Sequence, residues 1–157
     1  MPLDKELILI VDDEEMLTSV MAGFLESEGY KTLEAHNGEE ALKIYQEHKS
    51  DISLILCDIT MPIMNGLQML TEGIRQYGRM PLVLLTAHQE TAIVTEALRL
   101  GAIDYIVKPF EMDQLAKQVP IWIEIVKRTQ PTSSDSKSAK MEGLLRVQSS
   151  RINKKIS

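Results

Sequence analysis

The sequence predicts an α/β fold, a doubly wound parallel sheet of five strands with helices on both faces. Short apolar runs alternate with segments in which apolar residues recur every three or four positions, and this alternation is typical of repeated β-α-β units. Three of the strand-like segments, at residues 6–11, 52–57 and 81–86, are almost continuously apolar, as expected for strands that are covered on both faces. Because the connections are short and no second core is visible, we expect one three-layer α/β/α domain over residues 1–128.

Five short segments are predicted to be strands. They are Glu6–Val11, Lys31–Ala35, Ile52–Cys57, Pro81–Thr86 and Asp104–Val107. Pro81 suits the first position of its strand, where the missing N–H removes no ladder hydrogen bond.

A helix with one apolar face is predicted after each strand. The apolar faces run over Met16–Leu25, Ala41–Tyr45, Leu67–Ile74, Ile93–Leu98 and Leu115–Val126. Asp13 is expected to cap the first helix and Asn37 the second, and Gly101 is expected to end the fourth. Pro120 falls inside the last helix and deprives the carbonyl of Ala116 of its donor, so we expect a kink or a break there.

Composition argues against several classes of protein. In the 157 residues, no apolar run approaches the about 20 residues of a membrane span. The N-terminus lacks the basic and then apolar pattern of a signal peptide. Cys57 is the single cysteine, so there is no disulfide framework, and a cytoplasmic location is expected.

Charge separates an acidic body from a basic tail. The net charge is −6, but residues 137–157 hold six Lys or Arg against one acid, which leaves −11 for residues 1–136. An acidic body argues against general nucleic-acid binding, and we expect no direct DNA binding by this segment. Residues 129–157 are interpreted as a polar linker and basic tail, either disordered or forming a short helix.

Polar side chains that could bind a ligand or take part in a reaction occur at the ends of the predicted strands. Asp12 and Asp13 follow the first strand, Asp58 the third and Lys108 the fifth, and Thr86 ends the fourth. The carboxyl ends of parallel strands meet at one edge of the sheet, so these side chains should converge. Three crowded carboxylates repel unless a cation joins them, and hard oxygen ligands suit Mg²⁺. With an ammonium and a hydroxyl beside them, the arrangement fits phosphoryl transfer.

Each of these residues also has an ordinary interpretation when it is taken alone. Asp12 and Asp13 could be only a helix cap, Asp58 a turn residue before Pro62, and Lys108 a solvated charge. Their joint occurrence at successive strand ends favours a functional site.

Four motifs in order closely resemble the receiver domain of two-component response regulators. They are VDDEE (11–15), DITMPIMNG (58–66), LLTAH (84–88) and DYIVKPF (104–110). The resemblance covers residues 6–128 and implies the flavodoxin-like strand order 2-1-3-4-5, which a chemotaxis receiver also has.

The resemblance also implies roles for the acidic residues. Asp58 corresponds to the phosphoacceptor, and Asp12 and Asp13 to the acidic pair that binds Mg²⁺ together with Asp58. The backbone carbonyl of Thr60 corresponds to a further ligand of the metal, and Lys108 to a residue that contacts the phosphoryl group.

A second set of implied roles concerns the switch between two states. Thr86 corresponds to the hydroxyl that moves toward the phosphoryl group, Tyr105 to the aromatic rotamer switch, and Lys108-Pro109 to a cis peptide bond. The surface of the fourth helix, fifth strand and fifth helix would then change its affinity for partners, a homodimer among them.

The expected phosphoryl donor is a sensor histidine kinase or a histidine phosphotransfer protein, and the output partner is not identified by the sequence. The chain would not be an enzyme beyond catalysing its own phosphorylation and dephosphorylation.

Other functions are less consistent with the motifs. An aspartyl-phosphate-forming phosphohydrolase expects a second aspartate two residues after the nucleophile, where this chain has Thr60, and it expects a cap domain. A flavin-binding protein of similar topology would want a hydroxyl-rich loop after the first strand, where this chain has acids. A receiver used mainly as a docking module stays an alternative to an active phosphoacceptor.

Overall fold

The computed structural model describes residues 5–87 and 90–129. Within them five parallel strands form one sheet in the order β2-β1-β3-β4-β5, which confirms the predicted α/β fold and its strand order. The strands are β1 (Leu7–Val11), β2 (Lys31–Ala35), β3 (Ile52–Asp58), β4 (Leu82–Thr86) and β5 (Asp104–Val107). The helices are α1 (Glu15–Ser27), α2 (Gly38–His48), α3 (Gly66–Tyr77), α4 (Thr91–Leu100) and α5 (Met112–Thr129).

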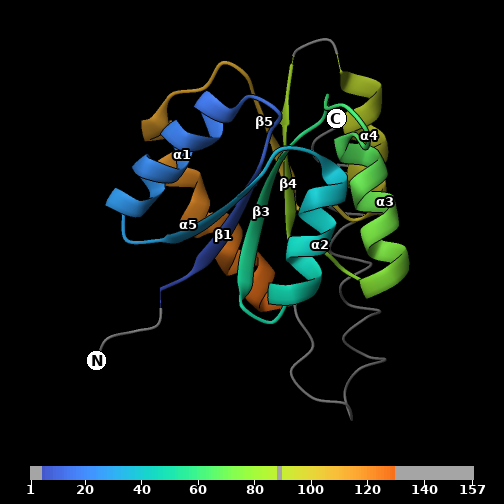
Figure 1. Cartoon of the computed structure of the whole chain (residues 1–157), viewed down its shortest axis with the longest axis horizontal. Helices are drawn as coiled ribbons and strands as arrows, with labels where there is room; N and C mark the ends of the chain where they lie inside the picture. The colour runs from blue at the N-terminus through green and yellow to red at the C-terminus, as the bar shows by residue number, and fades with distance from the viewer. Residues whose placement is uncertain (1–4, 88–89, 130–157) are drawn as a thin grey trace.

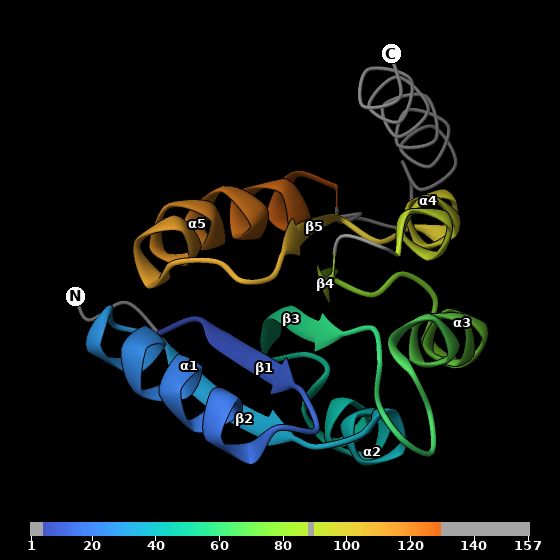
Figure 2. The ribbon, with the colours of Figure 1, turned by 90° about the horizontal axis from the view of Figure 1, so that it is seen from above.

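The helices form two layers, one on each side of the sheet (Figures 1 and 2). α1 and α5 cover one face, and α2, α3 and α4 cover the other. Successive residues of β1 alternate between the two cores: Ile8 and Ile10 belong to the α1 and α5 side, Leu9 and Val11 to the other. Burial on both faces explains why β1, β3 and β4 are almost continuously apolar in sequence, whereas the edge strands β2 and β5 are partly exposed.

The arrangement of the central strands positions the polar residues that follow them. β1 and β3 are neighbours, and the chain leaves them in opposite directions, from β1 to β2 and from β3 to β4. The register pairs Val11 with Cys57, so Asp12, which follows β1, and Asp58, the last residue of β3, emerge side by side. Ligands bind at such a switch point in parallel α/β sheets.

Asparagine side chains cap two of the helices. The amide oxygen of Asn37 accepts a hydrogen bond from the Glu40 N–H at 2.8 Å, which confirms the predicted cap of α2. At the start of α3, Asn65 and Gln68 form a reciprocal capping box, with hydrogen bonds of 2.8 and 2.9 Å.

The predicted cap of α1 by Asp13 is wrong. The residue that precedes the helix is Glu14, whose side chain makes no capping hydrogen bond, and Oδ1 of Asp12 accepts from the Glu14 N–H at 2.9 Å. Asp12 is fully buried and accepts the hydrogen bond from this N–H, whereas Asp13 is exposed. The Asp13 carboxylate is therefore not used by the helix.

A kink or a break was predicted at Pro120, and of these the break is wrong, because α5 continues from Met112 to Thr129. Pro120 lies on the exposed side of the helix. The opposite side buries five apolar residues, namely Leu115, Val119, Trp122, Ile123 and Val126. A proline inside a helix costs about 3 kcal/mol. Burying one large apolar side chain contributes about 1.5–3 kcal/mol, so the packing of α5 outweighs its proline.

In the described part of the chain, no helix has the length and apolar character needed to cross a membrane. α5 extends one residue past the predicted domain boundary at 128. The predicted linker and tail after Thr129 lie outside the described residues.

Candidate functional site

Asp12, Asp58 and Lys108 meet at the carboxyl edge of the sheet. Nζ of Lys108 lies 2.9 Å from Oδ2 of Asp12 and 3.2 Å from Oδ1 of Asp58. The side chain of Asp12 is fully buried, and those of Asp58 and Lys108 are 10% and 23% exposed. One ammonium therefore pairs with two carboxylates where little water screens them, which strengthens both interactions.

Asp13 adds a third carboxylate from the solvent side. Carboxylate oxygens of Asp12, Asp13 and Asp58 all lie within 4.8 Å of one another. Lys108 contributes one positive charge near three negative ones, so the cluster keeps an excess of negative charge. A divalent cation that prefers oxygen ligands, such as Mg²⁺, fits this set of donors.

The pKa of Asp58 reflects this environment. The pKa of Asp58 is raised from 3.8 to about 6: burial and the charge of Asp12 raise it, and Lys108 partly offsets both by its charge and hydrogen bond. The carboxylate is therefore mostly ionised at neutral pH, although its ionisation is opposed by the fold. Burial alone lowers the pKa of Lys108, but the hydrogen bond to Asp12 and the charge of Asp58 outweigh it and raise the pKa. Lys108 thus stays positively charged beside Asp58.

Gly66 holds the loop after β3 close to Asp58. The Gly66 N–H donates to the carbonyl oxygen of Ile59 at 2.8 Å. A Cβ at this position would lie 2.6 Å from the carbonyl oxygen of Asp58. Any side chain at residue 66 would therefore displace the backbone that carries the Asp58 carboxylate.

Thr86 ends β4, as predicted, and is almost fully buried. Its hydroxyl lies 3.2 Å from Oε1 of Glu90 and 3.0 Å from the carbonyl oxygen of Ala87. Glu90 was not among the predicted site residues. The signal in the sequence is an acid four residues after Thr86, directly before the predicted helix.

The remaining predicted residues lie around the cluster. Thr60 is exposed, and its hydroxyl donates to Oε2 of Glu90 at 2.7 Å. Tyr105 pairs with Leu84 in the register of β4 and β5, and its side chain is 36% exposed. It therefore lies on the edge strand of the sheet, outside the carboxylate–lysine cluster. The peptide bond between Lys108 and Pro109 is cis.

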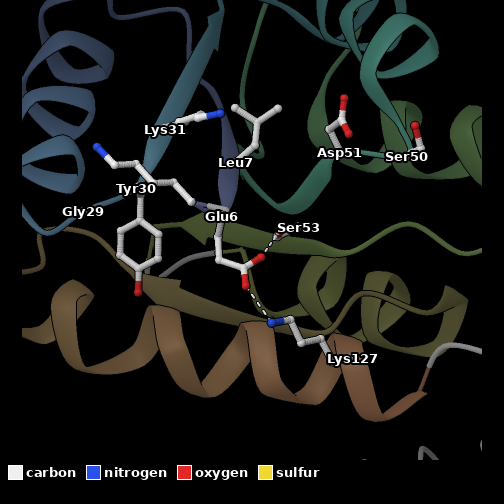
Figure 3. Close-up of a pocket in the computed structure, with 10 residues that line it drawn as sticks. Glu6, Leu7, Gly29, Tyr30, Lys31, Ser50, Asp51, Ser53 and Lys127 are labelled. Carbon is white, nitrogen blue, oxygen red and sulfur yellow. Dashed lines mark hydrogen bonds and ion pairs between the residues drawn. The ribbon is translucent and has the colours of Figure 1, made fainter. Parts of the chain in front are cut away.

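A separate hollow of about 940 Å³ lies at the amino edge of the sheet, away from Asp58 (Figure 3). There Glu6 accepts hydrogen bonds from the Ser53 hydroxyl and from Nζ of Lys127, the latter at 2.6 Å. These contacts attach the start of β1 to β3 and to the end of α5. The charges lining the hollow are mixed, and the acidic group at its centre is already paired, so we assign it a structural role.

The family model of the response regulator receiver domain matches residues 8–120. This chain belongs to that family. As a receiver domain it is a signalling module of a two-component system, which confirms the function class predicted from the motifs.

Relatives and solved structures agree with this assignment. The receiver domain is 40% identical over 108 residues to Regulatory protein AtoC of Escherichia coli K12, a match that covers 69% of this chain and 23% of AtoC. A response regulator receiver domain protein from Clostridium thermocellum has a TM-score of 0.74 at 27% identity, covering 80% of this chain and 99% of that one. The CheX–CheY–BeF3–Mg²⁺ complex from Borrelia burgdorferi gives a TM-score of 0.68 at 30% identity, covering 73% of this chain and 86% of the matched one. The chain therefore spans less than a quarter of the length of AtoC.

Proposed function

We propose that Asp58 accepts a phosphoryl group from the phosphohistidine of a sensor histidine kinase or a histidine phosphotransfer protein. The observation that carries this proposal is the pairing of a largely buried Asp58 carboxylate with Lys108 at 3.2 Å, beside the carboxylates of Asp12 and Asp13. A nucleophile, a fixed positive charge and a set of metal ligands are the parts that phosphoryl transfer needs.

The transfer is a displacement at phosphorus. One carboxylate oxygen of Asp58 attacks the phosphorus atom, and the bond to the imidazole nitrogen breaks with its electron pair going to the ring. The products are an acyl phosphate on Asp58 and an unphosphorylated histidine on the donor. Because its pKa is about 6, Asp58 is mostly ionised at neutral pH and ready to attack. Lys108 stabilises negative charge on the phosphoryl oxygens as they approach.

Asp12, Asp13, Asp58 and the backbone carbonyl of Thr60 are the proposed ligands of Mg²⁺. When bound, the ion neutralises charge on the carboxylates and on the transferring phosphoryl group. The solved complex from Borrelia burgdorferi, to which this chain is similar, contains both BeF3 and Mg²⁺, which supports the binding of Mg²⁺ by this chain. Asp13 suits this role because it is exposed and is not used as a helix cap.

The acyl phosphate is proposed to favour a second state of the domain. The Thr86 hydroxyl would then donate to a phosphoryl oxygen and Tyr105 would turn inward, changing the surface formed by α4, β5 and α5. Phosphorylation adds negative charge and strong hydrogen-bond acceptors at Asp58. A domain with two conformational states can convert this local change into a change at a distant surface. A homodimer or an output partner would bind through this surface, and the domain would catalyse only its own phosphorylation and dephosphorylation.

Acetyl phosphate with Mg²⁺ tests the assignment of Asp58. Intact-mass spectrometry should show one added phosphoryl group on the wild type and none on Asp58→Asn. Asp51→Asn is the matched control, because Asp51 is an exposed aspartate just before β3 and should not affect the reaction. A mass gain in Asp58→Asn, or none in the wild type, would contradict the proposal.

A further inference from the structure

Glu90 connects two loops at the edge of the candidate site. Its Oε2 accepts a hydrogen bond from the Thr60 hydroxyl at 2.7 Å, in the loop after β3. Its Oε1 accepts from the Ala87 N–H at 2.8 Å and lies 3.2 Å from the Thr86 hydroxyl, at the end of β4. Glu90 is also the residue directly before α4, which begins at Thr91. One side chain thus joins both loops to the start of a helix.

The contact with Thr86 involves a donor that the proposed phosphorylated state needs. A hydroxyl carries one hydrogen, so Thr86 cannot donate to Glu90 or to the Ala87 carbonyl and at the same time to an oxygen on Asp58. A carboxylate is a strong acceptor, and such charge-assisted hydrogen bonds are stronger than neutral ones. Before phosphorylation, the Thr86 hydroxyl therefore has two nearby acceptors, the Ala87 carbonyl at 3.0 Å and the Glu90 carboxylate at 3.2 Å, and Glu90 is the charged one.

Glu90 and Asp58 lie in the same electrostatic field, because the positive charge of Lys108 acts on both carboxylates. A phosphoryl group adds between one and two negative charges at Asp58. That added charge repels the Glu90 carboxylate and competes with it for the nearby donors.

We propose that Glu90 is a positioning residue that holds Thr86 in its unphosphorylated arrangement and is displaced when Asp58 is phosphorylated. Displacement frees the Thr86 hydroxyl for the phosphoryl oxygen and releases the residue that precedes α4. The contact thereby links the acceptor site to the start of that helix. This inference rests on the proposed phosphorylation of Asp58.

The test measures binding of beryllofluoride, a tetrahedral mimic of a phosphoryl group, in the presence of Mg²⁺ by titration calorimetry. Glu90→Ala removes the charged one of the two competing acceptors and should lower the dissociation constant about three- to tenfold, the effect of losing one partly exposed hydrogen bond to a charged group. Glu96→Ala is the matched control. Glu96 lies within α4, the helix that Glu90 precedes, and pairs with Arg99 at 2.8 Å, so its loss should leave the constant unchanged.

A merely structural role of Glu90 predicts a different result. Losing a stabilising contact at the start of α4 would lower the melting temperature and leave beryllofluoride binding equal or weaker. An equal or weaker affinity of Glu90→Ala therefore overturns the inference. Absence of binding to the wild type would instead contradict the proposed function, so the two failures are distinguishable.

A double-mutant cycle with Thr60→Val tests the route through Glu90. This substitution removes the hydroxyl that holds Oε2 and keeps the backbone carbonyl of residue 60. It should tighten beryllofluoride binding in the wild type, less than Glu90→Ala does, and should add nothing in the Glu90→Ala background. Equal effects of Thr60→Val in both backgrounds would show that its hydroxyl does not act through Glu90.

Discussion

Replacing Asp58 by Asn tests whether the acceptor carboxylate is ionised at a free-energy cost. The asparagine keeps the shape of the side chain and an oxygen that can face Lys108, but it carries no charge. The raised pKa of Asp58, from 3.8 to about 6, corresponds to about 3 kcal/mol at one unit per 1.36 kcal/mol. Because the site relaxes on ionisation and keeps some contact with solvent, we expect a gain in unfolding free energy of about 1–2 kcal/mol at pH 7 without metal.

The pH dependence of this gain follows from the direction of the shift. Folding favours the protonated form of Asp58, so the penalty is absent below the unfolded pKa of 3.8, increases as pH rises, and is complete above about 6. For a domain of this size, Asp58→Asn should melt about 3–8 °C above the wild type at pH 7.5 in EDTA. The difference should shrink toward zero near pH 4.

Differential scanning calorimetry across this pH range, with Asp51→Asn as the control, measures the effect. Asp51 is exposed, and its neutralisation should change stability by less than about 0.5 kcal/mol. Added Mg²⁺ should raise the melting temperature of the wild type more than that of Asp58→Asn, because one proposed ligand is lost. A melting temperature of Asp58→Asn at or below that of the wild type at pH 7.5, or a difference independent of pH, would refute the reasoning.

Three further changes have definite expected outcomes. Lys108→Met leaves Asp12 and Asp58 without their shared cation, so urea denaturation in EDTA should show an unfolding free energy lower by about 2–4 kcal/mol. An unchanged midpoint would contradict the ion-pair geometry. Gly66→Ala should lower the unfolding free energy by about 1–3 kcal/mol in the same assay, because its Cβ would lie 2.6 Å from the Asp58 carbonyl oxygen. A variant as stable as the wild type would show that the loop can shift to accommodate the methyl group. Removing residues 130–157 should leave phosphorylation by acetyl phosphate unchanged in mass spectrometry, since every proposed site residue precedes them; slower labelling would mean that this segment contributes to the site.

The errors of the sequence-based predictions have physical causes. Asp12 and Asp13 are adjacent acids, and either could cap α1 by sequence alone. The sheet decides between them, because Asp12 directly follows a buried strand and accepts from the Glu14 N–H, while Asp13 is exposed. At Pro120 the local rule predicts a kink or a break, but α5 does not break, because its buried face supplies more free energy than the proline removes.

Glu90 shows a different limit of prediction from the sequence. Its contacts join residues 30 and 4 positions away, in loops with no regular repeat. No periodicity of the sequence predicts which acid near a strand end will reach a given hydroxyl. The conformations of both loops decide it.

The sequence by itself determined the order of strands and helices and the residue that follows each strand. Periodicity and turn residues act between near neighbours, and parallel strands bring their carboxyl ends to one edge. That was enough to predict that Asp12, Asp58, Thr86 and Lys108 would lie at the same edge of the sheet. Only the tertiary structure decided the separations of 2.9 and 3.2 Å at Lys108, the raised pKa of Asp58 and the engagement of Thr86 with Glu90. Coulomb and hydrogen-bond energies change steeply over fractions of an ångström, and such distances depend on how loops far apart in the chain pack together.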